Sequence, residues 1–144
     1  MTVDRTDPPT LAPPVHDIYS HVAVGRGSAI VGIAGQIALD ADGNLVGAGD
    51  HGAQAEQAFR NFKLALAAAG CGSADLLKYT VHVVGHRLEL VEPIFAAGRR
   101  VFGDDWPRTA STLLGVEALG NPDWLIEIDG LAIVPSNDSP SSTQ

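Results

Sequence analysis

The sequence contains a single cysteine, Cys71, so no disulfide bond can form within the chain. Such sparse use of cysteine is typical of a reducing compartment, and we expect a cytoplasmic protein. The sequence also lacks any run of about 18 apolar residues, which argues against a membrane-spanning helix and against a membrane partner. Because the amino-terminal residues MTVDRTDPPT have no apolar core, we expect no secretory signal.

Basic residues are scarce: 9 lysines and arginines stand against 17 aspartates and glutamates, giving a formal net charge of −8. Since affinity for nucleic acids depends on cations that neutralise phosphates, we expect no nucleic-acid partner. Metal ligands do not cluster either. His82 stands on a predicted strand, where four residues span about 13 Å, so that His86 is too distant to share one metal ion with it. We therefore predict no metal site.

The 144 residues are expected to form one domain over residues 16–134, between two polar tails. Residues 1–15 contain four prolines, and residues 135–144 read PSNDSPSSTQ. Proline lacks a backbone donor, and these polar segments bury too little apolar surface to offset the entropy of ordering. We expect both tails to be flexible.

Apolar periodicity predicts the element order β-β-α-β-α-β-β within the domain. The expected strands are residues 21–24, 28–34, 76–84, 112–118 and 125–134, and the expected helices run from the Asp50 cap to Gly70 or Gly72 and over residues 88–102, where Leu88 belongs to the apolar stripe. Gly25-Arg26-Gly27 predicts a hairpin turn between the first two strands. Two helices on one sheet face give a two-layer α+β sandwich, whose uncovered face predicts self-association.

Two stretches carry polar side chains of the kinds that bind substrates or take part in catalysis. Trp106-Pro107-Arg108-Thr109-Ala110-Ser111-Thr112 leads from the second helix into a strand and offers one arginine, one serine and two threonines. Glu127 and Asp129 share one face of the last strand, where carboxylates are costly unless they are paired, hydrogen-bonded or exposed in a cleft. Two interpretations stay open: a salt bridge on an edge strand, or a site in which Glu127 orients or deprotonates water.

The stretch AGQIALDADGNLVGAGDHGAQAEQAFRNFKLALAAAGCGSADLLKYTVHVV, which begins at Ala34, resembles the RidA/YjgF family, also labelled L-PSP. The shared features are a strand that ends in Gly35-Gln36, a helix start with Gln54 and Gln57, and Asn61, followed by an Ala-Ala-Gly helix end. The similarity extends over residues 19–134. It implies a chorismate-mutase-like fold, a homotrimer with three clefts between subunits, and hydrolytic deamination of small enamines and imines without a metal or organic cofactor.

The resemblance also implies roles for single residues. Glu127 matches the family glutamate that positions water, Tyr19 matches an aromatic residue that lines the cleft, and Gly35 and Gln36 match the strand end beside the substrate. The family places a carboxylate-binding arginine at the head of the penultimate strand. The strand register puts Ser111 at that position, because a one-residue slip would turn every apolar side chain to the opposite face.

An alternative register, fixed by Pro107, moves Arg108 to within one position of the family arginine. Arg108 and Thr109 therefore remain candidate substrate-binding residues beside Ser111. The leading hypothesis is a RidA-like hydrolase or deaminase for a small enamine, imine or related metabolite. The alternative is a non-catalytic trimer that binds a small metabolite in the same cleft, and a third possibility is an enzyme for a neutral substrate. Some relatives are endoribonucleases, which the charge of −8 disfavours here.

Overall fold

The computed structural model describes residues 2–137, and its centre is a mixed four-stranded sheet with the strand order β3-β6-β4-β5. β6 is antiparallel to both neighbours, whereas β4 and β5 are parallel and are joined by a helical crossover, as parallel strands require. The main elements are β1 (Val3–Thr6), β2 (Val22–Gly25), β3 (Ala29–Gln36), α1 (His51–Ala68), β4 (Leu76–Val84), α2 (Val91–Phe102), β5 (Ala110–Val116) and β6 (Ile126–Val134).

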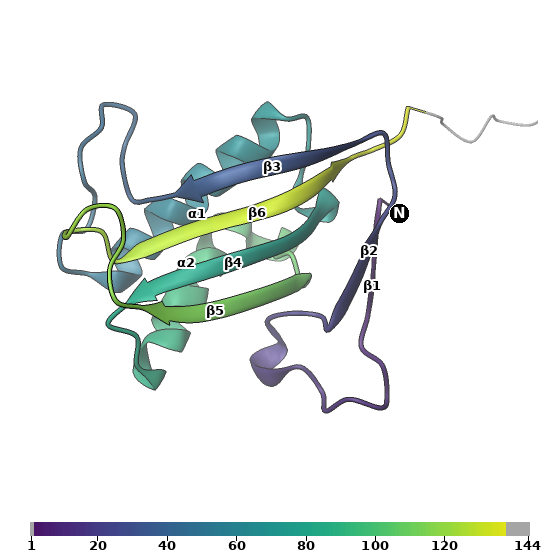
Figure 1. Ribbon diagram of the computed structural model, residues 1–144, viewed down its shortest axis with the longest axis horizontal. Helices are drawn as coiled ribbons and strands as arrows, with labels where there is room; N and C mark the ends of the chain where they lie inside the picture. Colours follow the sequence, from purple (N-terminus) through teal and green to yellow (C-terminus); the bar gives the residue numbers. More distant parts are fainter. Residues whose placement is uncertain (1, 138–144) are drawn as a thin grey trace, which may run out of the picture.

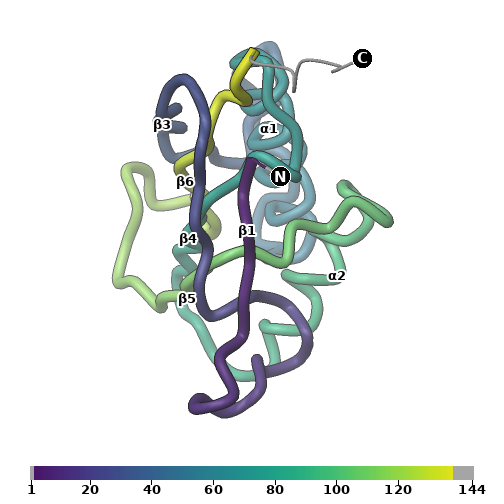
Figure 2. Tube along the Cα trace, turned by 90° about the vertical axis from the view of Figure 1, so that its right-hand side faces the viewer, coloured from purple at the N-terminus to yellow at the C-terminus, as the bar shows by residue number. Residues whose placement is uncertain are grey.

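Both helices cover the same face of this sheet and leave the other face open (Figure 1, Figure 2). The predicted order β-β-α-β-α-β-β is therefore found from β2 to β6, in a mixed α+β fold. α1 begins as predicted at Asp50, whose carboxylate accepts a hydrogen bond from the Ala53 amide at 3.0 Å. It ends before Gly70, which has a φ of +74°, a left-handed conformation that suits glycine. No helix within residues 2–137 is long and apolar enough to cross a membrane.

The core between sheet and helices includes a group of aromatic rings around Trp106. Four rings lie edge-on or tilted to the indole, with centroids 5.8 to 6.3 Å away: Phe59, Phe95, Phe102 and Tyr79. The indole N–H donates to the Ile18 carbonyl at 3.0 Å. Trp106 therefore attaches the amino-terminal segment to the core, in addition to filling it.

The amino-terminal tail predicted for residues 1–15 is wrong, because Val3–Thr6 forms a strand. β1 pairs antiparallel with β2, and Val3 is only 2% exposed. Arg5 donates to the carbonyls of Ser73 and Leu76, each at 3.0 Å. The segment is anchored by the burial of Val3 and by the two bonds from Arg5 to backbone carbonyls, although four prolines follow it in the sequence. Of the predicted carboxyl-terminal tail, residues 138–144 lie outside the described residues.

The predicted hairpin between the first two expected strands is also wrong. β2 pairs with β1, whereas β3 pairs with β6, so the chain changes sheets at Gly25-Arg26-Gly27. A Cβ at Gly25 or Gly27 would overlap Ile133, so these glycines permit close approach to β6. Leu88 was expected in the buried stripe of the second helix but is 78% exposed, because it belongs to a 3-10 turn that precedes α2.

Gln54 connects the first turn of α1 to the loop that enters β6. Its side chain is fully buried, its amide donates to the Asp123 carbonyl at 3.1 Å, and its oxygen accepts from the Leu125 amide at 2.9 Å. These two bonds satisfy backbone groups that the loop cannot pair by itself. They fix the start of the strand that carries Glu127.

Gln54→Leu is expected to lower the free energy of unfolding by about 1–3 kcal/mol, because it removes two part-buried hydrogen bonds to the backbone, each worth about 0.5–1.5 kcal/mol. Urea unfolding followed by circular dichroism, at one protein concentration, measures the change. Gln57→Leu is the matched control, since that amide is only partly buried. A loss for Gln54→Leu no larger than the control's would contradict this role.

Candidate functional site

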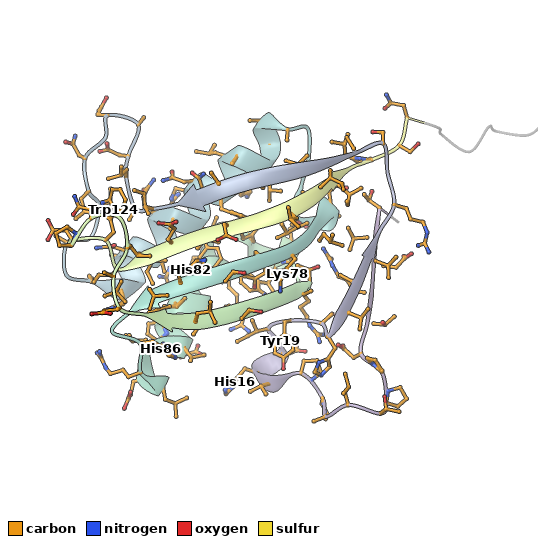
Figure 3. The ribbon with its side chains drawn as sticks, in the orientation of Figure 1. His16, Tyr19, Lys78, His82, His86 and Trp124 are labelled. Atoms are coloured by element: carbon orange, nitrogen blue, oxygen red, sulfur yellow. The ribbon has the colours of Figure 1, made fainter. Side chains whose placement is uncertain are left out.

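The open face of the central sheet carries a band of polar side chains from adjacent strands. On β4, Lys78, Thr80 and His82 point away from the helices, since the alternate residues of that strand are buried in the core. On β6, Glu127 lies opposite His82 and Asp129 lies opposite Thr80. Lys78 and His82 are visible on this face in Figure 3.

Within this band the two carboxylates of β6 differ in their partners. Asp129 Oδ2 lies 2.8 Å from His82 Nε2, a diagonal cross-strand pair. The Glu127 carboxylate has no ion pair or hydrogen bond within residues 2–137. The salt-bridge interpretation from the sequence therefore applies to Asp129, and Glu127 keeps its acceptor capacity for another molecule.

Glu127 lies against the end of β3, where Gly35 leaves room for its carboxylate. A Cβ at position 35 would overlap the side chain of Glu127, including its carboxylate oxygen. The structure thus brings Gly35 and Glu127 together, as the sequence predicted for one site. The Gln36 amide instead donates to the Ala34 carbonyl at 3.0 Å, so its nitrogen already has a local partner.

A second group of predicted residues surrounds a cavity of about 260 Å³ at the edge of β5. Ser111 pairs in register with Tyr79, whose ring faces the helices, so both side chains lie on the helical side of the sheet. Figure 3 shows Tyr19 and His16 beside this edge. The cavity is lined by Val15, His16, Ile18, Tyr19, Leu88, Val91, Phe95, Ser111 and Leu113.

Arg108 is held by groups of its own chain. Its guanidinium lies 2.8 Å from Asp17 and 3.6 Å from Asp7, and it donates to the Tyr19 carbonyl at 3.4 Å. His16 and Asp17 have φ values of 58° and 56°, a left-handed conformation that is costly for non-glycine residues. The ion pairs help to hold this strained turn, which forms part of the cavity wall. Arg108 itself is not among the residues that line the cavity.

Thr109 does not belong to either group, which corrects its assignment as a substrate-binding residue. It is fully buried, and its hydroxyl donates to the Leu77 carbonyl at 2.7 Å. Its backbone carbonyl accepts from the Ser20 amide at 3.1 Å. The residue therefore joins the start of β5 to β4 and to the amino-terminal segment, and its hydroxyl is buried within the chain.

The predicted site residues thus form two groups on opposite faces of the sheet. Glu127 and Gly35 lie on the open face, whereas Tyr19 and Ser111 line the cavity on the helical side. A small molecule cannot contact both groups of one chain, because the sheet separates them.

Sequence reasoning missed the pair formed by His82 and Asp129, which are 47 positions apart. His82 was considered only as a metal ligand with His86. The available signal was the shared face of Glu127 and Asp129, which indicated that one carboxylate required a partner but did not identify it. Among residues 2–137, no group of three or more histidine, cysteine, aspartate or glutamate side chains could hold a metal ion.

A four-stranded mixed sheet with two helices on one face, and a band of polar side chains that includes Glu127 on the other, defines a small two-layer α+β protein. The chain belongs to the Endoribonuclease L-PSP family, whose family model matches residues 10–134. This assignment confirms the resemblance derived from the sequence.

Solved structures agree with the family. YyfB of Yersinia pestis, a member of the conserved Rid protein family, is 34% identical with a TM-score of 0.84, over 92% of this chain and 99% of that one. A Mycobacterium tuberculosis member of the YjgF/YER057c/UK114 family is 23% identical with a TM-score of 0.58, over 92% and 99% of the two chains. Escherichia coli TdcF, solved with bound serine, is 24% identical with a TM-score of 0.61, over 81% and 94%. At these lower identities the likeness concerns the fold. A comparison with curated proteins gave no match.

Gly35→Ala is expected to lower the free energy of unfolding by about 1–3 kcal/mol, because the new methyl group must displace Glu127. Gly32→Ala, on the same strand, meets nothing within 4 Å and is expected to change stability by less than about 0.5 kcal/mol. Chemical denaturation of both variants measures the difference. Equal stability of the two would show that Glu127 does not depend on the space at Gly35.

Proposed function

We propose that this protein is a RidA-like hydrolase that deaminates a small imine, enamine or related metabolite, with Glu127 orienting the attacking water. The observation that carries the proposal is the Glu127 carboxylate, which faces Gly35 on the polar sheet face and has no partner within residues 2–137. A carboxylate without a partner in its own chain can accept a proton from a bound water molecule. The family to which the chain belongs supports this assignment.

The reaction requires little more than a positioned base and water. An enamine first tautomerises to the imine. The water oxygen then bonds to the carbon of the C=N group while Glu127 takes one water proton, and the nitrogen gains a proton. Glu127 then returns its proton to the nitrogen of the carbinolamine, the C–N bond breaks and ammonia leaves. The hydroxyl gives up its proton to solvent, which leaves a carbonyl compound. None of these steps changes the oxidation state or needs a metal or organic cofactor.

We further propose a homotrimer in which the cavity beside Ser111 and Tyr19 of one subunit faces Glu127 and Gly35 of the next. The separation of these two groups within one chain supports this arrangement, because a shared substrate needs both. Apolar side chains on the open sheet face also support it: Ile30 is 75% exposed, and Leu114 and Leu131 are each 43% exposed. Such side chains favour burial between subunits.

Glu127→Gln is expected to slow hydrolysis by about 10²-fold or more, because an amide cannot take the proton from water. Ammonia release from freshly generated imines, both 2-iminopropanoate and imines without a carboxylate, measures the rate. Glu117→Gln, at an exposed position outside the strands, is the matched control and should retain the wild-type rate. Wild-type rates equal to buffer for every imine would contradict the hydrolase.

The second candidate function is a non-catalytic trimer that binds a small metabolite in the same cleft. It is favoured by one observation: Arg108 is paired with Asp17 and Asp7 of its own chain. The strand register of the sequence, which predicts Ser111 at the position of the family arginine, agrees with this function. Ligand-dependent increases in melting temperature without ammonia release would support this function, since binding to the native state alone stabilises it.

The assembly is tested by light scattering coupled to size-exclusion chromatography. We expect three times the chain mass of 15.0 kDa. Ile30→Lys is expected to shift the protein toward monomers, because it places a charge in a contact that is buried between subunits. A wild-type monomer at micromolar concentration, or an unchanged mass for Ile30→Lys, would contradict the proposed use of the open face.

A further inference from the structure

The cavity beside Ser111 is lined mostly by apolar side chains. Among the residues that line it there is no lysine, arginine, aspartate or glutamate; the polar side chains are those of His16, Tyr19 and Ser111. Its volume of about 260 Å³ lies below the range of about 300–1,000 Å³ typical of drug-sized ligands. The cavity therefore suits a fragment-sized molecule with a mostly apolar body.

Two arginines support the wall of the cavity from outside its lining. Arg108 is paired with Asp17 and Asp7, so its positive charge is compensated. Arg99 donates to the His16 carbonyl at 3.4 Å, and its guanidinium lies 6.0 Å from the centre of the Trp106 ring. Neither arginine lines the cavity. A ligand carboxylate would therefore enter a mostly apolar space whose lining contains no lysine or arginine, within a chain of net charge −8.

Besides the His16 imidazole, the polar groups that line the cavity are the hydroxyls of Tyr19 and Ser111, which can donate to a neutral acceptor. The Tyr19 hydroxyl oxygen accepts from the Val15 amide at 3.3 Å, so its hydrogen remains free. The Tyr79 hydroxyl, in a residue that is 1% exposed, has no partner in hydrogen-bond geometry within residues 2–137, although Ser111 lies close enough to influence it. Burial raises the pKa of Tyr79 well above its ordinary value, an effect that neighbouring Ser111 partly opposes. Ser111 can accept from this buried group and donate to a ligand.

We infer that this site takes a small neutral molecule, with an apolar body and one hydrogen-bond acceptor such as a ketone or imine, in preference to the carboxylate of the same skeleton. The inference rests on the proposed function only in assigning the cavity to the substrate cleft. The apolar body fills the space between α2, β5 and the 15–19 segment. The acceptor is held by the hydroxyls of Ser111 and Tyr19.

The test compares 4-phenyl-2-butanone with 2-oxo-4-phenylbutanoate, two probes that differ only in a methyl group replaced by a carboxylate. We expect the ketone to bind the wild-type protein at least about tenfold more tightly, measured by titration calorimetry or ligand-observed NMR. Equal affinities, tighter binding of the acid, or no binding of either probe would overturn the inference.

Two variants that each remove one carboxylate test whether Asp17 compensates the charge of Arg108. Asp17→Asn removes the carboxylate 2.8 Å from Arg108 and is expected to raise the affinity for the acid several-fold, while the affinity for the ketone changes little. Asp4→Asn is the control, because it also removes one carboxylate from an arginine, Arg26, outside the cavity wall. An equal change in both variants would show that only net charge matters, and would contradict the proposed compensation of Arg108.

Binding of these probes does not require turnover, so the two proposals fail separately. In Glu127→Gln the preference for the ketone should persist while hydrolysis is lost. Hydrolysis that depends on Glu127, together with tighter binding of the acid, would overturn the ligand class and leave the hydrolase standing. A preference for the ketone without hydrolysis of any imine would overturn the hydrolase and leave the ligand class standing.

Discussion

The packing of Trp106 is the constraint on which much of the structure depends. Its indole lies among four aromatic rings from α1, β4 and α2, and its N–H donates a hydrogen bond to the Ile18 carbonyl. The segment that follows Ile18 is fixed to the strand start by the Ser20 side chain, which donates to the Arg108 carbonyl at 2.8 Å. Without the indole, the core would lose its central ring and the segment before Tyr19 would lose one of the bonds that hold it beside β5.

This attachment explains the use of charge around the cavity. The turn that contains His16 and Asp17 has an unfavourable backbone conformation, and arginines stabilise it from two directions. Guanidinium groups suit this task, since they are always charged and can contact a carboxylate and a carbonyl together. An arginine that is already paired with carboxylates of its own chain binds a ligand carboxylate less strongly. For Arg108, support of this turn therefore competes with binding of a carboxylate.

Much of the fold was predictable because its signals are local. The helical periodicity before Gly70, the Asp50 cap and the alternation along β4 depend on neighbouring residues, and these predictions were confirmed. The sheet change at Gly25-Arg26-Gly27 was missed because the same glycines suit a tight turn and a close approach. β1 was missed because its stability comes from one buried valine and from bonds made by Arg5 across about 70 positions.

The site was predictable only in part for the same reason. The sequence identified Glu127 and Ser111 as residues of interest through the family register, and Gly35 lies against Glu127 as expected. The partner of Asp129 depends on which residue of β4 lies diagonally across from it, and the burial of Thr109 depends on the carbonyl of Leu77. Such contacts follow from strand pairing, which residue spacing along the chain does not reveal.

The placement of Glu127 and Ser111 on opposite sheet faces has a consequence for how such a protein diversifies. The glutamate is carried by a central strand between two paired neighbours, where change disturbs the whole sheet. The cavity is bordered by the end strand, one helix and a surface turn, where loops accept substitutions and insertions more readily. The lining of the cavity can therefore change through the turn while the strand glutamate and its surroundings stay as they are. Within one fold, these two groups of residues can evolve separately.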